Sequence, residues 1–265
     1  MTSEITRQVA VRGGQLPVRA RAGNRPAVVF LHYWGGSHRT FAPVIARLPS
    51  ATAVLSYDNR GWGAARELPG PYGIEQLADD VLDVARQLIT GPYILAGHSM
   101  GGKVAQLVAA RRPEGLAGLV LIAPAPPLPV VDAQAAQALS HAYDSSATVE
   151  NALEHVLTYR PLGAAVREQV VADSLSAAAD ARLAWLMDGI TRDITEAASA
   201  IEVPVLILAG EHDQVEPPKV LEANLLPVIP GARMTVIEDT GHLLPLEAPG
   251  PVADLLSEFA AATEQ

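Results

Sequence analysis

The sequence predicts an α/β fold in which helices cover both faces of a mostly parallel sheet. Two observations support this prediction. Short apolar runs rich in β-branched residues alternate with segments of helical period, and the runs are apolar throughout rather than at every second residue. A strand buried on both faces reads as a continuous apolar run, so these runs are typical of a sheet enclosed by helices.

Eight segments are expected to form strands. The first two, 5–11 and 16–21, alternate apolar and polar residues around Gly13 and Gly14, which predicts an antiparallel hairpin. The other six are the continuous apolar runs at 27–31, 53–57, 93–96, 119–123, 205–209 and 234–237. Segments with helical period, expected to form the covering helices, lie at 40–48, 74–89, 100–110 and 252–261.

The alternation of strand and helix fails once, between 124 and 200. This stretch contains only an Ala- and Leu-rich helical pattern, opened by the proline-rich segment 123–129 and closed by Val203 and Pro204. It is expected to be either a helical insertion between two strands or a string of helices that cover the sheet.

Composition narrows the class of protein. The chain has 265 residues, of which 49% are hydrophobic and 18% charged, as in a folded globular protein. A net charge of −10 disfavours nucleic acid and anionic membranes as partners, because both would repel this surface. No cysteine is present and the N-terminal residues do not read as a signal peptide, so we expect a cytoplasmic protein. The oligomeric state is left open.

The segment GHSMGG at 97–102 carries the clearest chemical signal. It follows a predicted strand and opens a predicted helix, which is the setting of the G-x-S-x-G nucleophile motif. A serine on so tight a turn needs strained backbone angles, and flanking glycines let the neighbouring backbone approach. The helix after it directs backbone N–H groups at developing negative charge. Ser99 is therefore the predicted nucleophile.

With this motif the chain resembles the α/β-hydrolase superfamily over nearly its whole length, and most of all the small serine esterases and cofactor-free haloperoxidase-like enzymes. The resemblance implies an eight-stranded sheet and a triad in the chain order serine, acid, histidine. The base is then expected to be His242, in the loop after the last strand. The acid is expected to be Asp213, just past the strand at 205–209.

Three other carboxylates compete with Asp213 for the role of the acid: Glu211, Glu216 and Asp239. Some relatives carry the acid one strand earlier, but there the chain reads Ala-Pro-Ala-Pro at 123–126 and offers no carboxylate. That absence favours Asp213.

The family also implies an oxyanion hole built from two backbone N–H groups, those of Met100 and Trp34. The second comes from the segment HYWGG at 32–36, in which Tyr33 stands where the family usually has glycine. Tyr33 is a candidate substrate-binding residue. The turn DNRGWG at 58–63 also matches the family, where it is mainly structural, so Arg60 is expected to tether loops rather than to bind substrate.

By the same resemblance, residues 125–200 are expected to form a helical cap over a core domain made of 1–124 and 201–265. The cap carries more large apolar side chains than a solvent-exposed insertion needs, so part of it is expected to form an apolar roof above Ser99. Trp185 and Met187 are the residues of this roof that are expected to bind substrate. Packing within the cap is the alternative for both.

The predicted function is hydrolysis of a carboxylic ester-like small molecule by Ser99, His242 and Asp213, with water as the second substrate. Neither a cofactor nor a metal is expected, because no phosphate-binding loop and no metal-ligand spacing occurs. A lactone hydrolase and a carbon–carbon bond hydrolase would use the same triad. A ligand receptor without turnover is the alternative outside the enzymes, to be distinguished by sustained turnover of a simple ester.

Overall fold

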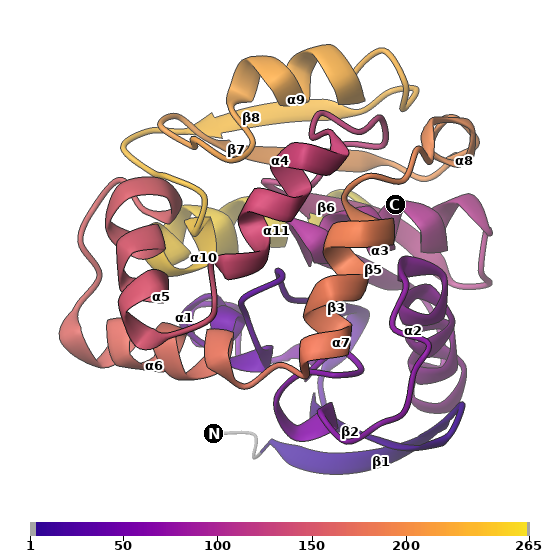
Figure 1. Cartoon of the computed structure of the whole chain (residues 1–265). Coiled ribbons are helices and arrows are strands. Elements are labelled where there is room, and N and C mark those ends of the chain that lie inside the picture. Colours follow the sequence, from indigo (N-terminus) through magenta and orange to yellow (C-terminus); the bar gives the residue numbers. More distant parts are fainter. Residues whose placement is uncertain (1–3, 264–265) are drawn as a thin grey trace.

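The computed structural model describes residues 4–263 and contains one eight-stranded sheet (Figure 1). The strands lie in the order β1-β2-β4-β3-β5-β6-β7-β8, and β2 is antiparallel to both of its neighbours while all the later pairs are parallel. The strands are β1 (Ile5–Val11), β2 (Gly14–Arg21), β3 (Asn24–Leu31), β4 (Thr52–Tyr57), β5 (Tyr93–His98), β6 (Leu116–Ile122), β7 (Val205–Gly210) and β8 (Arg233–Ile237). The predicted mostly parallel α/β fold is therefore confirmed, down to the N-terminal hairpin.

Helices lie on both faces of this sheet, and in Figure 1 the helices α4 to α7 lie nearest to the viewer. The α-helices are α1 (Ala42–Ile45), α2 (Ile74–Leu88), α3 (Met100–Ala110), α4 (Ala133–Ala138), α5 (Ser146–Ala152), α6 (Ala164–Leu175), α7 (Ala179–Ala184), α8 (Thr195–Ser199), α9 (Pro218–Leu225), α10 (Leu244–Glu247) and α11 (Pro249–Thr263). The shorter 3₁₀ turns are η1 (His38–Phe41), η2 (Gly63–Ala65) and η3 (Leu139–His141), and η4 (Leu153–Leu157) and η5 (Trp185–Gly189) are π-helical. None of the described helices is long and apolar enough to cross a membrane.

Alternation along the central strands explains why these runs are apolar throughout. Successive side chains of a strand point to opposite faces of the sheet. Val29 and Leu31 accordingly join the cluster that contains the apolar faces of α2 and α3, whereas Val28 and Phe30 join a second cluster with α1 and α11. Both faces of the sheet are thus buried.

The helix expected at 40–48 differs from the prediction. The chain forms the 3₁₀ turn η1, capped by the Ser37 side chain, and then only the short helix α1. Pro43 occupies the first turn of α1, where a missing N–H costs nothing, and Pro49 follows soon after. The proline spacing limits this helix to little more than one turn.

Residues 125–200, called the helical insertion below, contain helices and loops and no strand. In Figure 1 the insertion runs from magenta to orange and lies on the side of the sheet that faces the reader. Its last helix, α8, packs against α3. The insertion therefore lies between strands β6 and β7 in the chain.

Arg60 joins two segments in the interior, as the sequence indicated. Its guanidinium is fully buried and donates to both carboxylate oxygens of Asp80, at 2.8 and 2.7 Å, and to the Pro69 carbonyl oxygen at 2.7 Å. A bidentate pair of this kind is among the strong hydrogen-bonded arrangements in proteins. The pair links the turn after β4 to helix α2.

Arg60→Met is expected to lower the free energy of unfolding by about 3–5 kcal/mol, because the Asp80 carboxylate stays buried without its partner. Chemical denaturation measures this loss. The matched control is Arg86→Met, which removes an exposed ion pair to Asp83 within α2 and should cost about 1 kcal/mol or less. Equal losses in the two variants would contradict the structural role of Arg60.

Candidate active site

The carboxyl ends of the parallel strands meet at one edge of the sheet, where ligands bind in open α/β folds. The loop 32–36 leaves β3 there, Ser99 follows β5, Asp213 follows β7 and His242 follows β8. Residues far apart in the sequence are thereby brought to one place by the parallel topology.

Ser99 lies on a strained turn between β5 and α3. Its φ of 52° and ψ of −113° fall outside the regions that non-glycine residues favour. The turn is held from both sides, since the Ser99 N–H donates to the Ile122 carbonyl oxygen and the Ser99 carbonyl oxygen accepts from Ala125. The side chain stands at the start of α3 and lines a cavity described below.

Two glycines of the motif permit this turn by letting backbone meet backbone. A Cβ on Gly97 would lie 2.4 Å from the Gly101 carbonyl oxygen, and a Cβ on Gly101 would lie 2.3 Å from that of Leu31. Real side chains do not approach so closely. The G-x-S-x-G spacing thus has a steric cause in this fold.

His242 and Asp213 form a buried pair. The imidazole Nδ1 lies 2.9 Å from Asp213 Oδ2, and both residues are almost fully buried. The other carboxylate oxygen, Oδ1, accepts from the backbone N–H groups of Val215 and Glu216 at 2.8 and 2.9 Å. Burial alone would raise the pKa of Asp213, but the His242 ring and these donors together lower it below its usual value. The arrangement holds a carboxylate against one imidazole nitrogen.

The rival carboxylates have other partners or none. Asp239 is half-exposed and pairs with Arg160, and Glu211 accepts from the Asp239 backbone N–H. Glu216 lies three residues after Asp213, and within the described residues its carboxyl group forms no hydrogen bond with the His242 ring. Of the four candidates, the structure brings Asp213 to the imidazole.

The backbone around His242 is held by two further groups. The His242 carbonyl oxygen accepts from Nε2 of the buried His98, at 2.8 Å, which fixes the proton of that ring on Nε2. Burial lowers the pKa of His98 to about 3, so the ring is neutral. The backbone N–H groups of His242 and Leu243 donate to the carbonyl oxygen of Leu157 in the helical insertion. The insertion therefore helps to position the histidine loop.

The loop after β3 is held without glycine at position 33. Tyr33 does not take a positive φ, and its buried ring packs against His98. Nδ1 of the fully buried His32 donates to the Tyr33 carbonyl oxygen at 2.7 Å, while its Nε2 accepts from the Asn59 backbone N–H at 2.9 Å. The loop therefore tolerates tyrosine because neighbouring hydrogen bonds set its conformation.

Trp34 follows in the same loop. Its carbonyl oxygen accepts from the Trp62 indole at 2.7 Å, and its own indole donates to the Arg182 carbonyl oxygen in the insertion at 3.2 Å. Within the described residues, no hydrogen bond engages the backbone N–H of Trp34 or of Met100. Both donors remain available at the edge of the sheet where Ser99 lies.

A cavity of about 510 Å³ opens between this edge and the insertion. Ser99 and His242 line it on the side of the sheet, and in the part of the chain that the structure describes no hydrogen bond joins their side chains. Both π-helical segments contribute, through Val156, Leu157 and Trp185. The remaining lining residues are Tyr33, Trp34, Ala138, Leu139, His141, Ala142, Tyr143, Ala147, Thr148, Asn151, Ala152, Ile190, Val215 and Glu216. The wall is mainly apolar.

The predicted substrate-binding residues divide between the cavity and the surface. Tyr33 and Trp185 line the cavity. Met187 does not: its side chain is 67% exposed, and this corrects the expectation that it faces the roof. Residues two apart on a helical segment point in different directions, so only one of Trp185 and Met187 can face inward.

Two lining residues were not expected to bind substrate. Tyr143 packs on the Trp34 ring, with ring centres 4.5 Å apart, and covers Gly35. It lies in an irregular loop, and no periodic pattern marks it. In the sequence Glu216 is a candidate only for the role of the acid, because a carboxylate in a loop gives no sign that it is buried.

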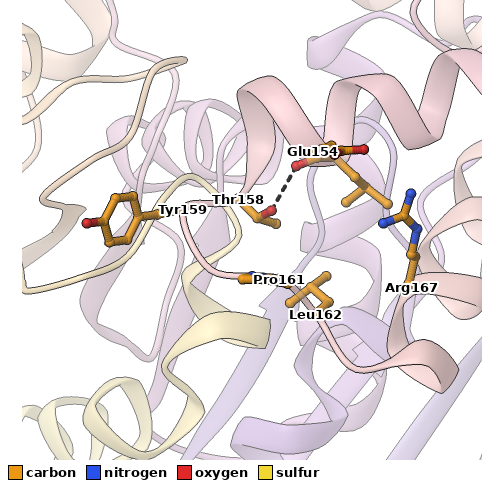
Figure 2. A pocket seen from close by; sticks show the side chains of 7 residues that line it. Glu154, Thr158, Tyr159, Pro161, Leu162 and Arg167 are labelled. Carbon is orange, nitrogen blue, oxygen red and sulfur yellow. Dashed lines mark hydrogen bonds between the residues drawn. The ribbon is translucent and has the colours of Figure 1, made fainter.

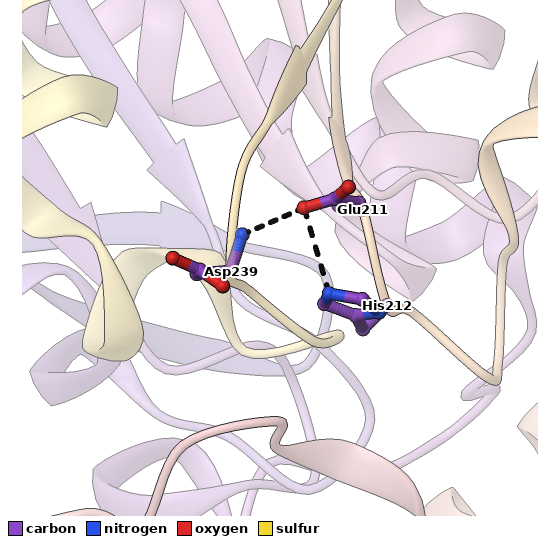
Figure 3. A group of neighbouring side chains, drawn as sticks. All are labelled: Glu211, His212 and Asp239. Carbon is purple, nitrogen blue, oxygen red and sulfur yellow. Dashed lines mark hydrogen bonds and ion pairs between the residues drawn. The ribbon is translucent and has the colours of Figure 1, made fainter.

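Two other surface features lie away from Ser99. A hollow of about 170 Å³ on the insertion is lined by residues such as Thr158, whose hydroxyl donates to the Leu153 carbonyl oxygen at 2.8 Å (Figure 2). Glu211, His212 and Asp239 bring possible metal-ligand atoms within 4.8 Å of one another (Figure 3). All three are exposed, and Glu211 accepts from the Asp239 backbone while Arg160 pairs with the Asp239 carboxylate. We assign no metal to this cluster.

Comparison with known proteins supports the same fold. The model of the alpha/beta hydrolase family matches residues 28–255. A pimeloyl-[acyl-carrier protein] methyl ester esterase of Neisseria meningitidis serogroup C is 29% identical over 225 residues, which cover 81% of this chain and 86% of that protein. The bifunctional esterase/perhydrolase DCH of Acinetobacter calcoaceticus is 31% identical over 209 residues, covering 72% and 76%.

Among solved structures, the esterase EaEST of Exiguobacterium antarcticum superposes with a TM-score of 0.89 at 21% identity, covering 97% of this chain and 100% of that one. The match of a family model over most of the chain is consistent with the nucleophile turn and the sheet order described above. The chain belongs to the alpha/beta hydrolase family and is a hydrolytic enzyme.

Proposed function

We propose that this enzyme cleaves carboxylic esters through an acyl-enzyme formed on Ser99. Its relatives are named as esterases and hydrolases, which supports ester hydrolysis in general. The observation that carries the finer assignment is the buried His242–Asp213 pair, 2.9 Å apart, beside the cavity that Ser99 also lines. A serine hydroxyl is a weak nucleophile and needs such a base, held in turn by a carboxylate.

In the first half of the reaction, Ser99 Oγ attacks the ester carbonyl carbon while His242 Nε2 takes the hydroxyl proton. Asp213 holds Nδ1–H and stabilises the imidazolium that forms. The backbone N–H groups of Met100 and Trp34, free of other partners, are proposed to donate to the oxyanion. The tetrahedral intermediate then expels the alcohol, which takes the proton from His242.

In the second half, water replaces the alcohol. His242 takes a proton from the water as its oxygen attacks the acyl carbon, and the same proton returns to Ser99 Oγ when the carboxylic acid is released. The helical insertion is proposed to act as a cap that shields these steps, because its residues form much of the cavity wall.

Ser99→Ala is expected to lower kcat for a simple aryl ester by about 10⁴-fold or more and to abolish labelling by a fluorophosphonate probe. The hydroxyl is the group that both reactions need. Ser257→Ala, on α11 and outside the cavity, is the control and should keep activity and label. Labelling of the Ser99→Ala protein would assign the nucleophile to another serine.

Asp213→Asn is expected to lower kcat by about 10⁴-fold while the protein stays folded, because the amide favours the wrong tautomer of His242. Steady-state kinetics and a thermal melt measure the two effects. Asp239→Asn removes a half-exposed carboxylate near the same loop and should change kcat little. A greater loss in the Asp239 variant would overturn the assignment of the acid.

Trp185→Ala is expected to shift kcat/KM toward longer acyl chains, by about tenfold for each added methylene that the enlarged cavity accepts. The measurement is kcat/KM over a series of acyl chain lengths, beside a thermal melt. Met187→Ala is the control, since its side chain lies outside the cavity. An unchanged ranking with a large fall in Tm would make Trp185 a packing residue only.

A further inference from the structure

Glu216 places a carboxyl group in the cavity wall that the proposed reaction does not use. The residue is only 3% exposed and lines the cavity together with Ser99 and His242. Its Oε2 is buried and has no hydrogen-bond partner within residues 4–263. Since buried polar atoms are nearly always paired in proteins, an unpaired one that borders a binding cavity needs an explanation.

The structural role of position 216 does not require a carboxyl group. Its contact with the triad is made by the backbone, whose N–H donates to Asp213 Oδ1 at 2.9 Å. Any residue with a backbone N–H supplies that bond, and an apolar side chain would avoid the cost of an unpaired polar atom. The side chain at 216 thus opposes stability where it stands, as residues at functional sites often do.

The surroundings favour the neutral form of this carboxyl group. Burial and the negative charge of Asp213 raise the pKa of Glu216 well above its usual range, against the opposing positive charge of Lys103. Lys103 forms no ion pair with Glu216 in the described structure; its Nζ donates instead to the Arg192 carbonyl oxygen at 2.6 Å. A neutral carboxyl group offers one O–H donor and remaining acceptor capacity.

We propose that Glu216 is a specificity-determining residue whose carboxyl group hydrogen-bonds a hydroxyl or oxo oxygen carried by the ester substrate. The inference rests on the proposed ester hydrolysis and names its substrate class as hydroxy- and oxo-substituted esters. Among the described residues, no lysine or arginine lines the cavity, so a neutral oxygen substituent fits it better than a carboxylate. The apolar remainder of the wall receives the hydrocarbon part.

The test compares matched p-nitrophenyl esters: hexanoate, and the same chain carrying one hydroxyl or oxo group at successive carbons. Butyrate esters of alcohols substituted in the same way cover the other side of the scissile bond. For the best placed substituent, wild-type kcat/KM should exceed that of the plain ester by about tenfold. Glu216→Gln, which keeps a donor and an acceptor, should retain most of this preference.

Glu216→Leu and Glu216→Met should abolish the preference, because the apolar side chains offer no hydrogen bond. They should also raise Tm by about 2–4 °C, since the unpaired carboxyl group is gone. Glu222→Leu, on the exposed face of α9, is the matched control and should keep the preference. Two results would overturn the proposal. One is a wild-type kcat/KM for every substituted ester that is about equal to that of its plain partner, and the other is a preference for the substituted ester that survives in both apolar variants.

A binding measurement separates this proposal from the proposed reaction. In a Ser99→Ala background, the Kd for the preferred oxygenated ester should rise about tenfold when Glu216→Leu is added, while the Kd for the plain ester should not rise. This result supports recognition by Glu216 even if Ser99 proves not to be the nucleophile. Equal changes in Kd for both esters would count against it.

Discussion

The active site depends on how closely helix α3 approaches strand β3. Gly101 lies so near the Leu31 carbonyl oxygen that a Cβ would come within 2.3 Å of it, and Gly97 meets Gly101 in the same way. This approach forces the chain to turn sharply at Ser99, which takes a φ of 52°. The strain is sustained because the hydrogen bonds of the Ser99 backbone to Ile122 and Ala125 hold the turn.

The helical insertion is joined to the sheet by hydrogen bonds at the loops that build the site. Leu157 accepts from His242 and its neighbour, and the Trp34 indole donates to Arg182. The Glu247 carboxylate accepts from the backbone of Gly241 and also from that of the segment 159–160. A change in the insertion would therefore reach the histidine loop and the loop after β3, as well as the shape of the cavity.

Burial sets the protonation of the polar groups around the site. His98 and His32 are fully buried, their pKa values are lowered by burial, and each is held by backbone hydrogen bonds. Asp213 is equally buried but keeps its charge, because the His242 ring and two backbone donors face it. Within residues 4–263 no donor faces Oε2 of Glu216, and burial together with the charge of Asp213 raises its pKa and favours the neutral acid. The pKa values of two carboxyl groups three residues apart are thus shifted in opposite directions.

The sequence by itself predicted the strands and the nucleophile turn, and the resemblance to the α/β-hydrolase superfamily implied the order of the candidate triad. The strands and the turn follow from local patterns: continuous apolar runs for strands such as β5, and glycines at fixed offsets around Ser99. The resemblance also implied where the acid should lie, and four carboxylates close to the last two strands were the candidates there. Local pattern predicted a helix at 40–48 that proline spacing cut short.

Only the tertiary structure decided which side chains face one another. The choice of Asp213 over Glu211 and Asp239 depends on how the loop after β7 meets the loop after β8, and no local pattern encodes that meeting. Packing also decided which side chains of the insertion face the cavity: Trp185 turns inward and Met187 turns outward. Both lie on a π-helical segment, whose side-chain directions the ordinary period of about 3.6 residues does not describe. The surroundings of Glu216 were decided in the same way, since the cavity that it lines is also bounded by residues of the insertion that lie far from it in the chain.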